Sequence, residues 1–112
     1  TSWMVQATIN GRARVLFLLD TGASYCVVAP ALARTLALPP TGSFATGQTA
    51  NGAVRAPVVR LRTLEHGTNR VSDVQAIVHD ALGPQVDGIL GLNFLNRFRY
   101  AIDPERRELE LE

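Results

Sequence analysis

Asp20 is the residue whose type and position in this sequence are best suited to chemistry. It follows the five apolar residues 15–19 and precedes Thr21 and Gly22. The apolar run is too short for a helix of usual length and is bounded by turn formers, so it predicts a buried strand. An ionised carboxylate at the end of such a strand is costly unless it is hydrogen-bonded or has a function. Gly22 permits a sharp turn and lets backbone N–H groups approach a neighbouring oxygen.

The residues around this tripeptide decide between an ordinary turn and a functional loop. Asp and Gly are common in turns, so Asp-Thr-Gly alone is a weak signal. Here Ala23 and Ser24 follow it, and a second element, Asp87-Gly88-Ile89-Leu90-Gly91, lies far downstream. In this order, with a glycine-bearing hairpin between them, the two elements favour the functional interpretation. The sequence resembles the retropepsin-like (retroviral-type) aspartic proteases, single-domain relatives of the pepsins, in their bacterial form.

The resemblance covers most of the chain and implies both its fold and its domain organisation. It implies an all-β protein with a closed β-barrel, the acid protease fold, carrying one short C-terminal helix and a flap hairpin. Residues 1–112 would form a single domain that is one half of a homodimeric enzyme. A chain of 112 residues is long enough for one hydrophobic core, which agrees with this organisation.

The chemistry implied is hydrolysis of peptide bonds by an aspartic endopeptidase. Two carboxyl groups share one proton; one acts as base toward water and the other as proton donor. A chain with one Asp-Thr-Gly can supply this pair only as a homodimer, with its twofold axis between the two copies of Asp20. By resemblance, Asp20 is catalytic, Thr21 braces the partner loop, and Gly22 and Ala23 surround the carboxylates and help to hold the substrate. No metal, cofactor or covalent intermediate is implied.

A second hairpin is expected between segments 44–48 and 54–61, with Ala50, Asn51 and Gly52 at its tip. Asn-Gly is a strong signal for a tight hairpin turn. An ordinary surface hairpin is the commoner outcome for small polar residues. The resemblance instead implies a flap, which would close over an extended peptide or protein substrate and pair with it through the backbone.

The remaining elements must place Asp20 at the centre of the molecule. Residues 4–10 alternate apolar and polar side chains, which indicates a half-buried strand, and Asn10-Gly11 turns it into the strand that ends at Asp20. Pro30 is suited to the first turn of a short helix. The pattern predicts strands over 25–28, 58–64, 71–79, 99–102 and 108–111, and short helices over 30–36 and 92–98.

Composition excludes several other classes of function. The net charge of +1 gives no support for a nucleic-acid or membrane partner. Cys26 is the single cysteine and is expected to be a small core residue, while His66 and His79 lack the spacing of metal ligands and are expected to be solvated. The sequence assigns no compartment; a membrane tether or export signal would have to come from a segment absent from it.

Three alternatives to the protease interpretation remain at this point. The first is a catalytically silent module that keeps the fold for peptide binding or dimerisation; the intact Asp20-Thr21-Gly22 argues against it. The second is an enzyme such as a glycosidase, which needs two suitably spaced carboxylates. Asp87 precedes its apolar pair rather than following it, so it is expected to bond a nearby turn and not to partner Asp20. The third is a purely structural barrel, which leaves Asp20 unexplained.

Overall fold

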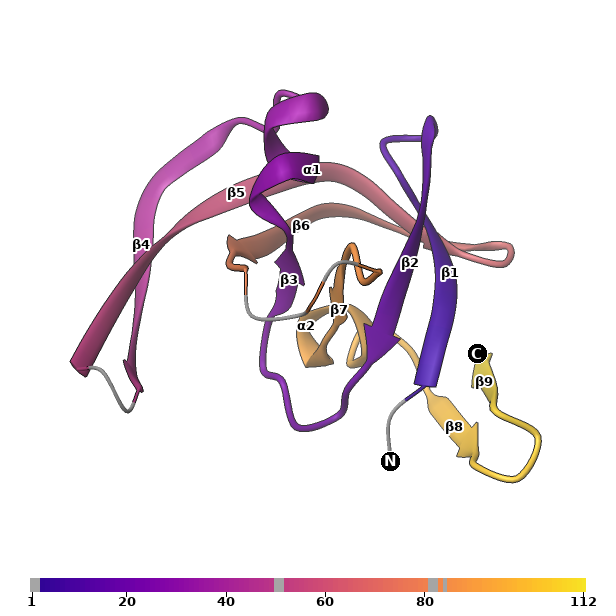
Figure 1. Cartoon of the computed structure of the whole chain (residues 1–112). Helices are drawn as coiled ribbons and strands as arrows, with labels where there is room; N and C mark the ends of the chain where they lie inside the picture. The colour runs from indigo at the N-terminus through magenta and orange to yellow at the C-terminus, as the bar shows by residue number, and fades with distance from the viewer. Residues whose placement is uncertain (1–2, 50–51, 81–82, 84) are drawn as a thin grey trace.

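The computed structural model describes residues 3–49, 52–80, 83 and 85–112, and these are mostly strands with two short helices (Figure 1). The first strands, β1 and β2, form the hairpin that leads to Asp20. In chain order the elements are β1 Trp3–Ile9, β2 Ala13–Leu19, β3 Cys26–Val28, α1 Pro30–Thr35, β4 Pro40–Thr49, β5 Gly52–His66, β6 Asn69–Val78, β7 Gly88–Leu90, α2 Leu92–Leu95, β8 Tyr100–Asp103 and β9 Glu108–Leu111.

Six of the strands close into a barrel. The main sheet has the order β1-β2-β7-β3-β6-β5-β4, and an additional pairing of β1 with β5, at Thr8↔Glu65 and Ile9↔Leu64, joins its two sides. Closure leaves β4 outside the barrel, paired only along β5. A closed barrel removes the exposed sheet edges that promote association. The predicted all-β fold with a closed barrel is therefore confirmed.

The barrel interior is formed by alternate residues of the strands. In β1 the buried side chains are Val5, Ala7 and Ile9, as the alternation predicts. In β2 burial alternates as well, so Leu16 is 38% exposed although the whole apolar run was expected to be buried. That expectation was wrong because successive strand side chains point to opposite faces, and only the inner face of this strand is fully covered.

The predicted hairpin turn between β1 and β2 is confirmed. Asn10 and Gly11 have φ values of 56° and 68°, and the Arg12 N–H donates to the Ile9 carbonyl at 3.1 Å. Positive φ at both central residues is what a type I′ turn requires, and Asn-Gly is the pair that adopts it most readily. Asn10 also exchanges two hydrogen bonds with Thr63 of β5, at 2.9 and 3.1 Å, which continue the pairing of β1 with β5 into this turn.

The hairpin of β4 and β5 is longer than the sequence pattern predicts. Pairing runs from Thr49↔Gly52 to Phe44↔Pro57 and resumes at Pro40↔Val59 after an irregularity. β5 then continues through the barrel wall as one strand of 15 residues, because its second half finds a new partner in β6. Of the predicted flap residues, Ala50 and Asn51 lie outside the described residues. Gly52 begins β5 in an exposed position with φ 109°.

Both predicted helices are present, and the second is shorter than predicted. α1 begins at Pro30, as expected. α2 ends at Leu95 rather than Phe98, because the N–H groups of Arg97 and Phe98 turn back to the carbonyls three residues earlier at 3.1 Å. The β8–β9 hairpin follows α2, so this helix is near the C-terminus without being the last element. No helix in the described part of the chain is long and apolar enough to cross a membrane.

Candidate active site

Asp20 lies directly after β2, next to the end of the short strand β7. β7 is parallel to β2, with Leu19 opposite Leu90, and the Asp20 N–H donates to the Leu90 carbonyl at 3.2 Å. β7 is also antiparallel to β3, with Gly88 opposite Val28. The downstream Gly-Ile-Leu-Gly element is thus inserted between the strand that enters the Asp20 loop and the strand that leaves it.

The loop itself fixes the carboxylate of Asp20. The Gly22 N–H donates to Asp20 Oδ1 at 2.8 Å, and the Ala23 N–H donates to the Asp20 carbonyl at 3.2 Å. A Cβ at Gly22 would lie 3.1 Å from the same Oδ1, which is tighter than ordinary contact. Asp20 and Ala23 are half-buried, whereas Thr21 and Gly22 are exposed. The four predicted residues therefore form one surface loop whose carboxylate is oriented by backbone.

Gly91 packs closely against the backbone of this loop. A Cβ at Gly91 would lie 2.6 Å from the Tyr25 carbonyl oxygen and 2.9 Å from that of Ala23, so only glycine allows the two segments to cross at this separation. The next two N–H groups also bind the loop: Leu92 donates to the Ala23 carbonyl at 2.8 Å and Asn93 to that of Ser24 at 3.1 Å. The start of α2 thereby anchors the Asp20 loop.

Asn93 is a residue of the site that sequence reasoning missed. Its Oδ1 accepts the Cys26 N–H at 2.7 Å, and its Nδ2 donates to the Gln75 carbonyl at 2.7 Å. One side chain therefore connects the start of β3, immediately after the loop, to β6. The available signal was weak: Asn93 is the only polar residue in the short apolar stretch 92–95.

Cys26 is the core residue that the sequence predicted. Its side chain is 0% exposed, and Sγ lies 3.5 Å from the Gly91 N–H, which donates to it. Burial raises the pKa of the Cys26 thiol from 9.0 to about 11, because the thiolate would lose its hydration.

We expect the Cys26 thiol to be unreactive in the folded protein. A pKa of about 11 instead of 9.0 lowers the thiolate fraction at pH 8 about a hundredfold, and burial slows access further. Alkylation by iodoacetamide, followed by mass spectrometry, should be at least that much slower in buffer than in concentrated guanidinium chloride. Alkylation rates that differ by only a few-fold would contradict this placement of the thiol.

Asp87 has a structural role at the other end of β7. Its Oδ2 accepts the Leu16 N–H at 2.8 Å, its own N–H donates to the Leu16 carbonyl at 3.0 Å, and its carbonyl accepts the Ala29 N–H at 2.9 Å. It therefore bonds the middle of β2 and the end of β3, and not only a local turn as expected. Asp87 precedes β7 while Asp20 follows β2, so the two carboxylates are at opposite ends of parallel neighbouring strands.

His66 is the last residue of β5 and contacts β1. His66 is half-buried, and its Nδ1 lies 2.8 Å from the Gln6 carbonyl oxygen, a protein partner that the sequence did not predict. The long β5 carries it beside β1, which the local sequence does not reveal. Within residues 3–49, 52–80, 83 and 85–112, no group of three or more His, Cys, Asp or Glu side chains could hold a metal ion.

The β4–β5 hairpin projects to the side of the molecule on which the Asp20 loop lies. In Figure 1 the end of β4, the start of β5 and the loop between β2 and β3 are all in the lower part of the view. On the hairpin, the Arg55 guanidinium lies 4.0 Å from the ring centre of Phe44, a cation–π contact at the surface.

Comparison with known proteins gives matches at the level of family and fold. Residues 5–94 match the family described as Aspartyl protease, a range that includes the Asp20 loop and β7. A retropepsin-like aspartic protease from Rickettsia conorii has a similar structure, with a TM-score of 0.71 and 27% identity, over 91% of this chain and 84% of that one. The retroviral protease-like domain of Ddi1 from Leishmania major shares the fold, with a TM-score of 0.66 and 22% identity, over 100% of this chain and 89% of that one. No curated protein sequence matches the chain.

Proposed function

The chain belongs to the aspartyl protease family, and from that membership we propose that it is an aspartic endopeptidase whose active site forms between two copies of the chain. The observation that carries the proposal is the Asp20 carboxylate, held by the Gly22 N–H at 2.8 Å on an exposed loop. Gly91 packs against this loop, and the N–H groups at the start of α2 donate to its carbonyls. In the described part of the chain, this carboxylate accepts a hydrogen bond only within its own loop and has no ion pair with the barrel.

Dimerisation follows from the chemistry proposed for Asp20. General acid and general base are both required, and two adjacent carboxyl groups that share a proton provide them without a metal. The sequence contains one Asp-Thr-Gly. Thr21 and Gly22 are exposed, so a second copy can approach the loop along a twofold axis. In this arrangement the 112 residues act as one domain and half of the enzyme.

The proposed reaction is a direct attack of water on the peptide carbonyl. The ionised Asp20 takes a proton from water as the water oxygen bonds to the carbonyl carbon, and the protonated Asp20 of the partner donates its proton to the carbonyl oxygen. The tetrahedral intermediate then loses a proton from its hydroxyl as the nitrogen accepts one, and the C–N bond breaks. The products are a carboxylic acid and an amine, and the pair again shares one proton.

Thr21 and the β4–β5 hairpin take the supporting roles. Thr21 would brace the loop of the second copy, and its exposure at the surface supports this role. The hairpin, with Ala50, Asn51 and Gly52 at its end, would act as a flap that closes over an extended peptide. Its projection toward the side of the Asp20 loop supports this role (Figure 1). Backbone pairing along a strand edge gives affinity for extended peptides with little dependence on their sequence.

Mixed dimers test whether two copies of Asp20 form one site. Wild-type chains and Asp20→Asn chains are refolded together, and cleavage of a fluorogenic peptide library is measured. Because a site with one Asn lacks half of its pair, activity should fall with the square of the wild-type fraction, so an equimolar mixture keeps about a quarter of the activity.

Mixing with Glu105→Gln is the matched control, since Glu105 is exposed in the β8–β9 turn and loses the same charge. Activity in that mixture should not fall. A linear decrease with Asp20→Asn would show that each chain works alone. A wild-type protein that binds the library peptides without cleaving any would favour the alternative, a catalytically silent module with the same fold.

A further inference from the structure

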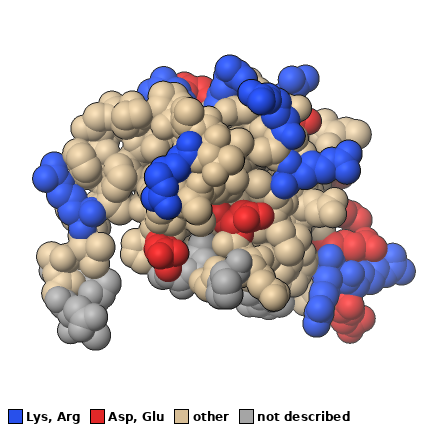
Figure 2. Space-filling model, turned by 45° about the horizontal axis from the view of Figure 1, so that its top comes forward, with Lys and Arg blue, Asp and Glu red and all other residues tan. Residues whose placement is uncertain are grey.

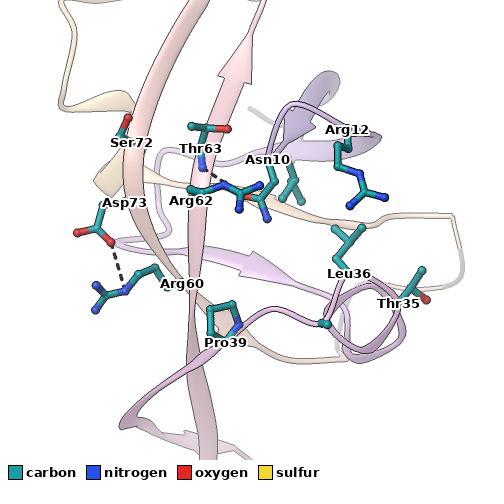
Figure 3. A pocket seen from close by; sticks show the side chains of 12 residues that line it. Asn10, Arg12, Thr35, Leu36, Pro39, Arg60, Arg62, Thr63, Ser72 and Asp73 are labelled. Carbon is teal, nitrogen blue, oxygen red and sulfur yellow. Dashed lines mark hydrogen bonds and ion pairs between the residues drawn. The ribbon is translucent and has the colours of Figure 1, made fainter.

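A large open pocket lies at the end of the barrel opposite the Asp20 loop. Its volume is about 780 Å³, and it opens between the β1–β2 turn, the end of α1 and the middle of β5 and β6 (Figure 3). In Figure 1 the β1–β2 turn and α1 are at the top and the Asp20 loop is at the bottom. The lining residues belong to neither the Asp20 loop nor β7, so the pocket is separate from the proposed active site.

The pocket combines apolar side chains with unpaired positive charge. Leu36 and Pro39 contribute apolar surface on one side. Arg60 is paired with Asp73 at 3.2 Å, whereas Arg12 and Arg62 have no ion-pair partner among the described residues. Figure 3 shows the Arg12 and Arg62 side chains on either side of Asn10. Figure 2 shows arginines gathered over this upper part of the molecule, with few acidic residues among them.

The backbone around the pocket is held in conformations that non-glycine residues seldom adopt. Three of the four non-glycine residues with positive φ in the described chain line it: Asn10 at 56°, Ala37 at 50° and Asp73 at 60°. Asp73 is inside β6, where the ladder passes from Leu61↔Val74 to Thr63↔Ser72 without a change of register and omits the opposed residues Arg62 and Asp73. The β1–β2 turn requires the φ of Asn10, and Ala37 directly follows the end of α1, whereas a positive φ inside a strand, as at Asp73, is uncommon for a residue other than glycine.

Strand β6 therefore deforms at the point where Asp73 meets Arg60. Among the described residues, Asp73 is the one carboxylate that lines the pocket, and its pairing with Arg60 leaves Arg12 and Arg62 without an ion-pair partner there. Planar guanidinium groups bind carboxylates through two parallel hydrogen bonds, and they are more readily desolvated than ammonium groups. Apolar walls with a few directed polar groups are typical of sites for small ligands.

We propose that this pocket binds a carboxylate carried on a short apolar body, with Arg12 and Arg62 on the carboxylate and Leu36 and Pro39 against the apolar part. A free organic acid and the C-terminus of a short peptide both offer this chemistry. A peptide C-terminus is also what the proposed hydrolysis releases, and only this connection depends on the proposed function. Binding itself requires no catalytic activity, so the two proposals can fail separately.

Nuclear magnetic resonance of the ¹⁵N-labelled full chain tests the proposal. The probes are hexanoate and the tripeptide Ala-Ala-Leu, each compared with a matched neutral compound, hexanol and the tripeptide amide. We expect saturable amide shifts at Ala37, Ser72 and Asp73 and none at Asp20 or Gly22. The neutral compounds should bind at least roughly tenfold more weakly than the acids, because they lack the charge-assisted hydrogen bonds. Binding of only one acid would identify which of the two sources supplies the carboxylate.

Substitution of the two arginines is the second arm. Arg12→Gln and Arg62→Gln should each weaken binding roughly tenfold, because each removes a charged donor. Both side chains are exposed, so the variants should fold, and thermal unfolding verifies this. Arg14→Gln, exposed in the same hairpin but outside the pocket, is the matched control and should leave binding unchanged.

Three outcomes would overturn the proposal. One is the absence of a saturable shift at Ala37, Ser72 and Asp73 with both acids. Another is that the acids bind no more tightly than their neutral counterparts, or that they bind the Arg12→Gln and Arg62→Gln variants as tightly as the wild-type protein. The third is binding of inorganic phosphate to this pocket as tightly as hexanoate binds. Such a result would remove the role assigned to Leu36 and Pro39, because phosphate has no apolar part.

Discussion

Asp20→Asn is expected to abolish peptide hydrolysis and to leave the fold intact. Asn is nearly the same size as Asp, and its Oδ1 can still accept the Gly22 N–H that orients the wild-type carboxylate at 2.8 Å. What it cannot do is exchange a proton with water or with the peptide carbonyl. In a dimer of variant chains the base and the acid are both lost, so kcat/KM should fall by at least about 10⁴-fold.

Cleavage of the peptide library by variant and wild-type protein, prepared in parallel, measures this loss. Circular dichroism and the dimer fraction from sedimentation establish that the variant is folded and assembled. Glu105→Gln makes the same chemical change at an exposed turn and should keep full activity. If Asp20→Asn keeps a tenth or more of wild-type kcat/KM, Asp20 does not carry the chemistry.

Gly88→Ala is expected to destabilise the protein strongly, because β7 leaves no room for a methyl group at this position. A Cβ at Gly88 would lie 2.0 Å from the Val27 carbonyl oxygen and 2.7 Å from Cε1 of Phe17. The first of these is a backbone atom of β3, which cannot move without breaking the pairing of β3 with β7. Overpacking of this kind should lower the free energy of unfolding by about 3 kcal/mol or more.

Urea denaturation at one fixed protein concentration measures this effect. Gly47→Ala is the matched control, because Gly47 is exposed in β4 and a Cβ there meets no atom within 4 Å. Its free energy of unfolding should change by less than about 0.5 kcal/mol. A loss of under about 1 kcal/mol for Gly88→Ala would mean that β7 does not fit between β2 and β3 as closely as the structure has it.

Asp20 and Gly88 have different roles in the same site. Asp20 carries the proposed chemistry, and Gly88 allows β7 to lie between the strands that flank the Asp20 loop. Gly91 then packs against the backbone of that loop, and the N–H groups of Leu92 and Asn93 donate to its carbonyls. A variant that disturbs β7 should therefore lose activity together with stability, whereas Asp20→Asn should lose activity alone.

The sequence by itself determined the features that depend on neighbouring residues. The Asn10-Gly11 turn, the start of α1 at Pro30 and the end of β2 directly before Asp20 are where the pattern predicts them. Each depends on a local property: tolerance of positive φ, a fixed φ without an N–H donor, or alternation along a strand. The resemblance to the retropepsin-like proteases also predicted the closed barrel, which is confirmed.

Only the tertiary structure decided how the distant segments meet. Asp87 bonds Leu16 across 71 positions of sequence, and Asn93 bonds Cys26 across 67. The sequence pattern likewise did not predict the full length of β5. Nor did it predict the pocket with Arg12 and Arg62, whose lining comes from the end of α1 and from β1, β5 and β6. Side chains at such positions are chosen by neighbours that the barrel brings together, and periodicity along one segment carries no record of them.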